Sequence, residues 1–175
     1  MRLFLEIIKD SSFPWSLGPH AFSVAAGYVG GGLPTHKGAG TNSLCLPETP
    51  EYDDDLTSGG NNRLSLLYSP LSDVHEGDIM CAVCLARGRS TTLMIPAKRT
   101  CPSGWTKEYG GLLMGSYKEY SGHNYLCIGR NPQARHGSMA DNEGQLFYPT
   151  SGVCSSLPCP PYVNGYEISC VVCTK

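Results

Sequence analysis

The feature that most constrains this chain is a cysteine motif that occurs twice, as CAVC at Cys81 to Cys84 and as CVVC at Cys170 to Cys173. Such a C-x-x-C motif can bind a metal, carry redox chemistry or supply two disulfides. The apolar neighbours of both copies favour β-strands, in which residues three apart point to opposite faces. The sulfurs of one motif then cannot converge on a zinc ion or a redox centre, so disulfides to different partners are favoured.

The two motifs close two similar halves of the sequence. The segment LCLPETP (residues 44–50) overlays LCIGRNP (126–132) at an offset of 82 residues. Upstream, VAAGYVGGG (24–32) overlays EYGGLLMGS (108–116) after a two-residue gap. A repeat of this length indicates two homologous halves. The glycines of the first copy favour a tight bend or a close approach of strands, since no lysine or helix follows them as a phosphate loop requires.

The two halves and the segment before them divide the chain into three parts. We predict a first, truncated repeat at residues 24–98, a second, complete repeat at 99–175, and an N-terminal segment at 1–23 that matches neither. Residues 91–96, TTLMIP, are apolar and β-branched and lie where the repeats join. We therefore predict a strand there that ties the two halves together.

The composition favours an irregular all-β chain. It contains 21 glycines and 13 prolines, which interrupt helices throughout. Only RLFLEIIKD (residues 2–10) has apolar residues at helical spacing. We predict two homologous, disulfide-stapled subdomains in tandem, with at most one short N-terminal helix.

Charge and cysteine content exclude several classes of function. With 13 basic and 15 acidic residues there is no basic surface to neutralise phosphates, so we expect no nucleic acid partner. Its 41% hydrophobic content suits a core but not a membrane span. Nine cysteines are typical of a secreted chain, so we expect an extracellular protein.

The titratable residues do not form a pattern typical of an active site. The acidic run EYDDD (residues 51–55) lacks the spaced oxygen ligands of a calcium loop and favours a solvated turn. The histidines lack metal-ligand spacing and are interpreted as surface residues of loops. We therefore expect no enzyme, no catalytic residue, no metal and no cofactor. The histidines are His20, His36, His75, His123 and His136.

Aromatic residues are concentrated in the second half. Tyrosines in small β-domains commonly pack with the hydroxyl at the rim, so packing in the core or an interface is expected. Exposed rings could alternatively stack on a sugar. These residues are Trp105, Tyr109, Tyr117, Tyr120, Tyr125, Phe147, Tyr148, Tyr162 and Tyr166.

Several phrases of the sequence resemble a known family. IPAKRTCPSGW before the second half, together with CAVC and the final CVVC, resembles the duplicated C-terminal noncollagenous domain of type IV collagen. The segments GYVGGGLPTHKGAGTNSLCLP and CSSLPCPPYVNGYEISCVVCTK are similar to the short-chain, spongin-like collagens of invertebrates. The resemblance covers about residues 24–175. It implies two similar β-rich subdomains with a disulfide set in each.

The sequence departs from that family in two respects. None of its 175 residues belongs to a Gly-X-Y tract. The first half also lacks both the opening CP-x-G and a counterpart of the short loop between Cys154 and Cys159.

Eight cysteines can be assigned to pairs. Repeat-equivalent positions predict Cys45 with Cys81 and Cys127 with Cys170, each joining a Leu-Cys strand to a closing strand. The resemblance implies two further pairs, Cys101 with Cys173 and Cys154 with Cys159.

Cys84 is the ninth cysteine and is predicted to be unpaired. The equivalent of Cys101 should stand near Leu17, where the chain reads WSLGPHAFS. The start MRLFLEIIKD is also a poor signal peptide, because Glu6 and Lys9 interrupt its apolar run. We hypothesise that residues 1–22 are not the native start of this half and that Cys84 lies beside a partly unsupported edge.

The resemblance implies a non-enzymatic module of the extracellular matrix that assembles with itself. We expect a trimer-based homo-oligomer, in which TTLMIP exchanges between subunits or halves, and collagen-like or other matrix proteins as partners. The alternative is a secreted carbohydrate-binding, lectin-like or immune recognition protein with glycans as ligands.

Overall fold

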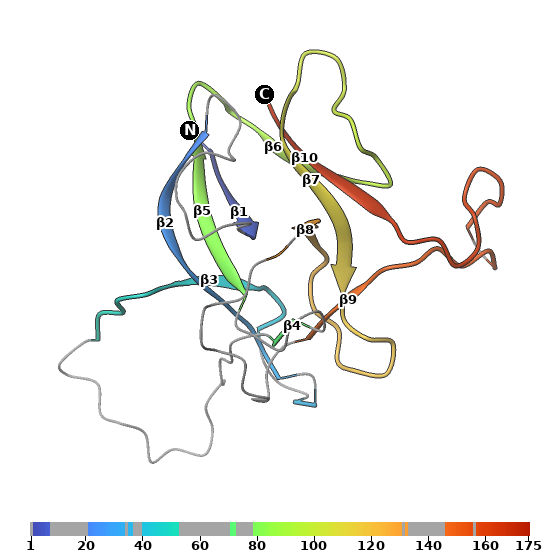
Figure 1. Cartoon of the computed structure of the whole chain (residues 1–175), viewed down its shortest axis with the longest axis horizontal. Coiled ribbons are helices and arrows are strands. Elements are labelled where there is room, and N and C mark those ends of the chain that lie inside the picture. The colour runs from blue at the N-terminus through green and yellow to red at the C-terminus, as the bar shows by residue number, and fades with distance from the viewer. Residues whose placement is uncertain are drawn as a thin grey trace.

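The computed structural model describes residues 2–7, 21–33, 35–36, 40–52, 71–72, 79–130, 132, 146–155 and 157–175. Every regular element in these residues is a strand (Figure 1), so the predicted all-β class is confirmed for this part of the chain. The strands are β1 (Arg2–Ile7), β2 (Ala21–Gly30), β3 (Leu44–Pro47), β4 (Leu71–Ser72), β5 (Met80–Ala86), β6 (Thr92–Pro96), β7 (Thr106–Gly115), β8 (Leu126–Gly129), β9 (Leu146–Pro149) and β10 (Ser169–Thr174).

The helical spacing of apolar residues near the N-terminus does not produce a helix over Arg2–Ile7. These residues form the strand β1. β1 pairs antiparallel with β5 along all six residues. A helix this short is marginal in water, whereas a strand that lies along another gains backbone hydrogen bonds with it. Tertiary pairing therefore overrides the local pattern.

The strands form two sheets with corresponding orders. The first sheet has the order β1-β5-β2-β3. The second sheet contains β6-β10-β7, and β8 also pairs with β7. β1, β5, β2 and β3 of the first sheet therefore correspond to β6, β10, β7 and β8 of the second. Beyond β7 the second sheet continues through β9 to β4, which pairs parallel to β9.

The predicted strand at TTLMIP is present as β6. It pairs antiparallel with β10 and forms an edge of the second sheet. The boundary predicted after Lys98 therefore separates β6 from the sheet in which it pairs. The division of the chain into two tandem repeats stays a prediction.

Both sheets have the same register at their central strands. Gly27 of β2 lies opposite Cys81 of β5, and Gly111 of β7 lies opposite Cys170 of β10. These are the glycines and cysteines that the repeat makes equivalent. An added Cβ at Gly27 would lie 1.6 Å from a carbonyl oxygen of β3, and one at Gly111 would lie 1.8 Å from a carbonyl oxygen of β8. The close approach of strands predicted for this glycine-rich segment is therefore present in both sheets.

A β-bulge also occurs at equivalent places. The register between β2 and β5 shifts between Ser23 and Ala25, which leaves Val24 as the extra residue. The register between β7 and β10 shifts so that Glu108 is the extra residue. A bulge bends and twists its strand, so each sheet curls at the same point.

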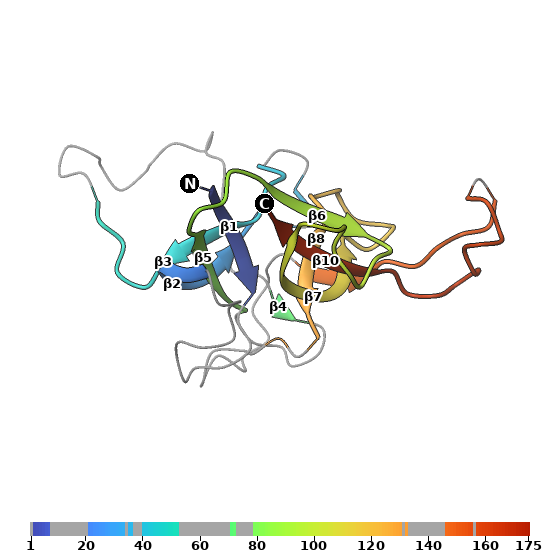
Figure 2. The ribbon, with the colours of Figure 1, turned by 90° about the horizontal axis from the view of Figure 1, so that it is seen from above.

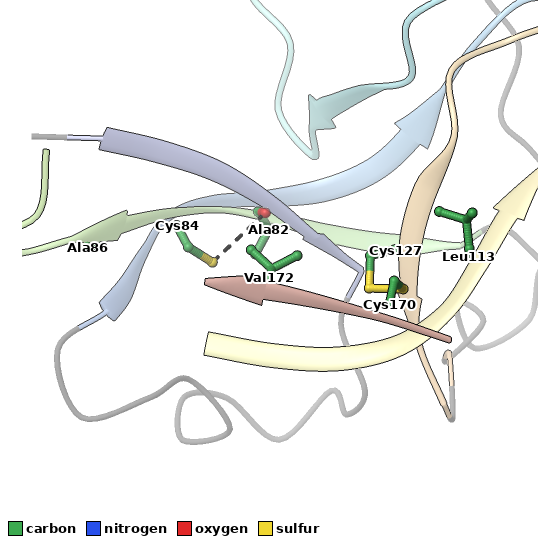
Figure 3. Packing of buried hydrophobic residues seen from close by; sticks show 7 residues of the cluster. All are labelled: Ala82, Cys84, Ala86, Leu113, Cys127, Cys170 and Val172. Carbon is green, nitrogen blue, oxygen red and sulfur yellow. Dashed lines mark hydrogen bonds between the residues drawn. A yellow bond between two sulfur atoms is a disulfide. The ribbon is translucent and has the colours of Figure 1, made fainter. Parts of the chain in front are cut away.

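The core lies between the two sheets, which occupy opposite sides of the molecule in Figures 1 and 2. Both buried clusters combine residues of the two sheets, so the halves share one core. Figure 3 shows Val172 of β10 beside Ala82 and Cys84 of β5. The first cluster contains Ala82, Cys84, Ala86, Leu113, Cys127, Cys170 and Val172, and the second contains Val29, Ile79, Cys81, Met114, Ile128 and Phe147.

Candidate interaction surface

Eight of the nine cysteines form four disulfides. The two Cα atoms of each pair are 5.7 to 5.9 Å apart, which is a normal separation. The pairs are the four that the repeat and the resemblance predict: Cys45–Cys81, Cys101–Cys173, Cys127–Cys170 and Cys154–Cys159. Several disulfides in one chain are compatible with an extracellular protein.

Two of these disulfides join strands that are not neighbours. Cys45 of β3 bonds to Cys81 of β5, although β2 pairs with both strands. Cys127 of β8 bonds to Cys170 of β10 in the same way across β7. Strands two places apart in a flat sheet are separated by about 10 Å. The Cα atoms joined by these two disulfides are only 5.8 and 5.7 Å apart, so the outer strand must fold over the central strand. It does so at Gly27 of β2 and Gly111 of β7, where the absence of a side chain leaves room for a carbonyl group of the outer strand.

Cys84 belongs to none of the four disulfides and is fully buried on β5. Its thiol donates a weak hydrogen bond to the Ala82 carbonyl oxygen, at 4.0 Å. The unsupported edge predicted beside Cys84 is wrong, because β5 pairs with β1 on one side and β2 on the other at this residue. Leu17, where a partner would be expected, lies outside the described residues.

The segment predicted to match neither repeat contributes backbone to the first sheet. Phe22 and Ser23 pair with β5 at the positions that Thr106 and Lys107 take beside β10. The hypothesis about the native start concerns residues 1–22, most of which lie outside the described part, and stays a prediction.

A long arm extends from the second sheet between β9 and β10. We define the arm as residues 150–155 and 157–168, and it projects away from both sheets in Figures 1 and 2 (orange to red). Its base is fixed to β7, because the Leu113 N–H donates to the Ile168 carbonyl oxygen at 2.8 Å. The Thr150 N–H donates in turn to the Leu113 carbonyl oxygen at 2.9 Å. The arm thus starts from a strand, β7, that pairs with β8, β9 and β10.

Hydrogen bonds order the arm along its length. The Gly152 N–H donates to Tyr166 O at 3.1 Å, and the Gly165 N–H donates to Gly152 O at 2.8 Å. Nearer the tip, the Cys154 N–H donates to Asn164 Oδ1 at 3.0 Å. The Cys154–Cys159 disulfide closes the loop beside this contact. Hydrogen bonds within the arm therefore add to those that fix its base to β7.

The arm carries exposed apolar side chains. Tyr166 has 68% of its surface exposed, and three further apolar residues are also exposed: Val153, Leu157 and Val163. No charged residue other than Glu167 occurs between residues 150 and 168. Exposed apolar side chains gathered on one segment are typical of a surface that another molecule covers.

A second surface feature is a cluster of three tyrosines just beyond the C-terminal end of β7. The ring centroids of Tyr117 and Tyr148 are 5.3 Å apart, and those of Tyr117 and Tyr120 are 5.4 Å apart. The Tyr120 and Tyr148 centroids are 6.4 Å apart. Tyr117 and Tyr120 are 37% and 40% exposed. The rings therefore pack on each other at the surface.

The histidines within the described residues are His36 and His123. The ring of His123 packs edge-on against Phe147, with centroids 5.1 Å apart. Its two nitrogens lie 3.1 Å from Asn124 O and 3.2 Å from Leu146 O. His123 therefore packs beside the core, against the buried Phe147. His20, His75 and His136 lie outside the described residues.

No group of three or more His, Cys, Asp or Glu side chains in the described residues could hold a metal. Of the acidic run, Glu51 and Tyr52 are exposed, while residues 53–55 lie outside the described part. The expectations of no enzyme and no cofactor stay predictions.

Sequence reasoning identified neither the arm nor the tyrosine cluster as a surface feature. The arm has a local signal, since the run SSLPCPPYVNGYE combines prolines, a short disulfide loop and little charge. The tyrosine cluster has a weaker signal, because Tyr148 is far in sequence from Tyr117 and Tyr120. Only the pairing of β9 with β7 brings them together.

No known protein-family model matches the chain. In the part of the chain that the structure describes, no helix is long and apolar enough to span a membrane.

Proposed function

We propose that this chain is a non-enzymatic self-assembly module of the extracellular matrix, which binds copies of itself and joins collagen-like or other matrix proteins. The observation that carries the proposal is the arm, with its exposed Val153, Leu157, Val163 and Tyr166 on an ordered projection. Burying such residues against a partner is favourable in proportion to the apolar area removed from water. The proposal assigns no catalytic residue, metal or cofactor.

The order of the arm favours tight association. A segment that is already ordered by its own hydrogen bonds and disulfide loses less conformational entropy on binding than a disordered one. Aromatic side chains commonly dominate such contacts, so Tyr166 is the residue expected to contribute most.

β6 supports association at a second place. It is an edge strand of the second sheet, and Leu93 on it is exposed. Edge strands present unpaired backbone groups that a strand of another chain can pair with. The exchange of residues 91–96 between subunits, expected from the sequence, stays part of the proposal.

The resemblance to the noncollagenous domain of collagens supplies the class of assembly. That resemblance implies two similar β-rich subdomains with a disulfide set in each, and the four disulfides and the corresponding strand orders are compatible with it. A trimer-based homo-oligomer in a secreted matrix protein follows from the resemblance.

The role of the arm in self-association is tested by comparing the same change, tyrosine to serine, at an exposed residue in the arm and at one outside it. Tyr166→Ser should weaken self-association about tenfold or more, as loss of a central aromatic contact does. The matched control is Tyr52→Ser, because Tyr52 is 84% exposed and lies outside the arm. Sedimentation velocity over a dilution series gives both association constants. Equal constants for the two variants would exclude the arm as the contact.

A secreted carbohydrate-binding recognition protein is the second candidate function. Tyr125 favours it, because it is exposed and follows Asn124 in the sequence, whose side-chain amide donates a hydrogen bond to Asn42 Oδ1. Exposed aromatic rings next to amides are suited to stacking on sugars and to hydrogen bonding their hydroxyls. Binding of the chain to a defined class of sugars on a glycan array, lost in Tyr125→Ser, would favour this candidate over the first.

A further inference from the structure

We propose that the cluster of Tyr117, Tyr120 and Tyr148 is a site of oxidative tyrosine coupling, at which a peroxidase with hydrogen peroxide joins two phenol rings of one chain. The inference goes beyond the proposed function and does not depend on self-association, because all three rings belong to the same molecule.

The first argument is proximity. Tyr117 is the central ring, since its centroid lies 5.3 Å from that of Tyr148 and 5.4 Å from that of Tyr120. At these separations the ring carbons of neighbouring phenols are in van der Waals contact. Holding two reacting groups together replaces a bimolecular encounter with an intramolecular one. A radical formed on any of the three rings therefore has a coupling partner in contact.

The second argument is access. Tyr117 and Tyr120 each expose more than a third of their surface. A buried pair of rings could not deliver electrons to an external oxidant so readily. By contrast, Tyr109 is less accessible, and its hydroxyl donates to the Cys127 carbonyl oxygen at 3.1 Å.

The third argument is the place of the rings in the fold. Tyr117 and Tyr120 lie in the connection between β7 and β8, where the Tyr120 N–H donates to Tyr117 O at 3.0 Å. Tyr148 lies on β9. A bond from Tyr117 to Tyr148 would tie this connection covalently to the neighbouring strand.

The reaction balances with one molecule of peroxide. Each of two phenols loses the hydrogen atom of its O–H group to the oxidant, so hydrogen peroxide takes up two electrons and two protons and becomes two molecules of water. The two phenoxyl radicals join through ring carbons ortho to oxygen. Each of those carbons then gives up its hydrogen as a proton, and each oxygen regains one, which restores two phenols linked by a carbon–carbon bond.

The experiment uses the full chain at high dilution with a haem peroxidase and hydrogen peroxide. The disulfides are then reduced and the chain is digested with trypsin. Because Lys118 lies between Tyr117 and Tyr120, and Arg130 and Arg135 precede Tyr148, the three tyrosines fall in different peptides. Coupling therefore appears as a pair of peptides joined with the loss of two hydrogens, together with dityrosine fluorescence.

We expect peptide 108–118 to be joined to 119–130 or to 136–175. Tyr117→Phe keeps the ring but removes the phenol, and should lower the yield severalfold. Tyr52→Phe is the matched control, since it removes an exposed tyrosine outside both the cluster and the arm and should leave the yield unchanged. Coupling that is equal in Tyr117→Phe and the unmodified chain, or that occurs only between chains, would overturn the proposal. The same pattern of joined peptides in the chain unfolded by denaturant would also overturn the proposal.

Discussion

Gly27 and Gly111 determine how closely the strands of each sheet can approach. Each lies where a carbonyl oxygen of the next strand occupies the position of a Cβ atom. The obstructing atoms belong to backbone, so they cannot move aside as a side chain can. Any larger residue must push the strands apart and weaken their hydrogen bonds.

Gly111→Ala should therefore lower the free energy of unfolding by about 1–3 kcal/mol or more, as overpacking does. The measurement is denaturant unfolding with the disulfides intact. Gly122→Ala is the matched control, because an added Cβ there has no other atom within 4 Å. Equal stability of the two variants would contradict the close strand approach.

Cys84 gives a second test at the residue scale. Its side chain is fully buried in the cluster between the sheets. A maleimide should leave it unmodified in the folded chain and label it once the chain is unfolded without reducing agent, since burial blocks access. Peptide mapping identifies the labelled residue. Labelling of Cys84 in the folded chain at the rate of a small thiol would contradict its burial.

The disulfides belong to the scale of elements, and their effects should differ with the loop they close. Replacing Cys127 and Cys170 by alanine removes a disulfide that joins residues 43 positions apart. In the chain-entropy account this should lower the free energy of unfolding by about 4 kcal/mol. Replacing Cys154 and Cys159 opens a separation of 5 residues, worth about 2 kcal/mol.

Thermal unfolding should thus show the larger loss of stability for the first double variant. The second should have its main effect on self-association, because its disulfide orders the arm. A Cys154→Ala/Cys159→Ala chain that is less stable than the first variant yet associates normally would contradict both roles.

The sequence predicts some of these elements better than others. The disulfides that link β3 with β5 and β8 with β10 could be predicted, because their cysteines occupy equivalent positions in the two repeats. The strand β6 could be predicted because its residues are β-branched and apolar. The strand β1 could not be predicted, since its strand form depends on pairing with β5, almost eighty residues later. The pairing of β4 with β9 has no local signal for the same reason.

At the scale of the whole molecule, the two sheets contact each other through sides that are not equivalent. Cys84 belongs to the cluster that joins β5 to β10, whereas its repeat-equivalent Cys173 does not. Cys170 belongs to that cluster, whereas its equivalent Cys81 lies in the other one. Contacts between like units through unlike surfaces can continue from one copy to the next and close into rings. In the proposed assembly, further copies would continue this packing.

The molar mass of the full chain in solution tests self-assembly most directly. Sedimentation equilibrium should be measured with the disulfides intact, at concentrations up to tens of micromolar. The proposal predicts a trimer or a dimer of trimers, whose proportion falls on dilution. A mass equal to that of a single 18.8 kDa chain at every concentration would contradict it.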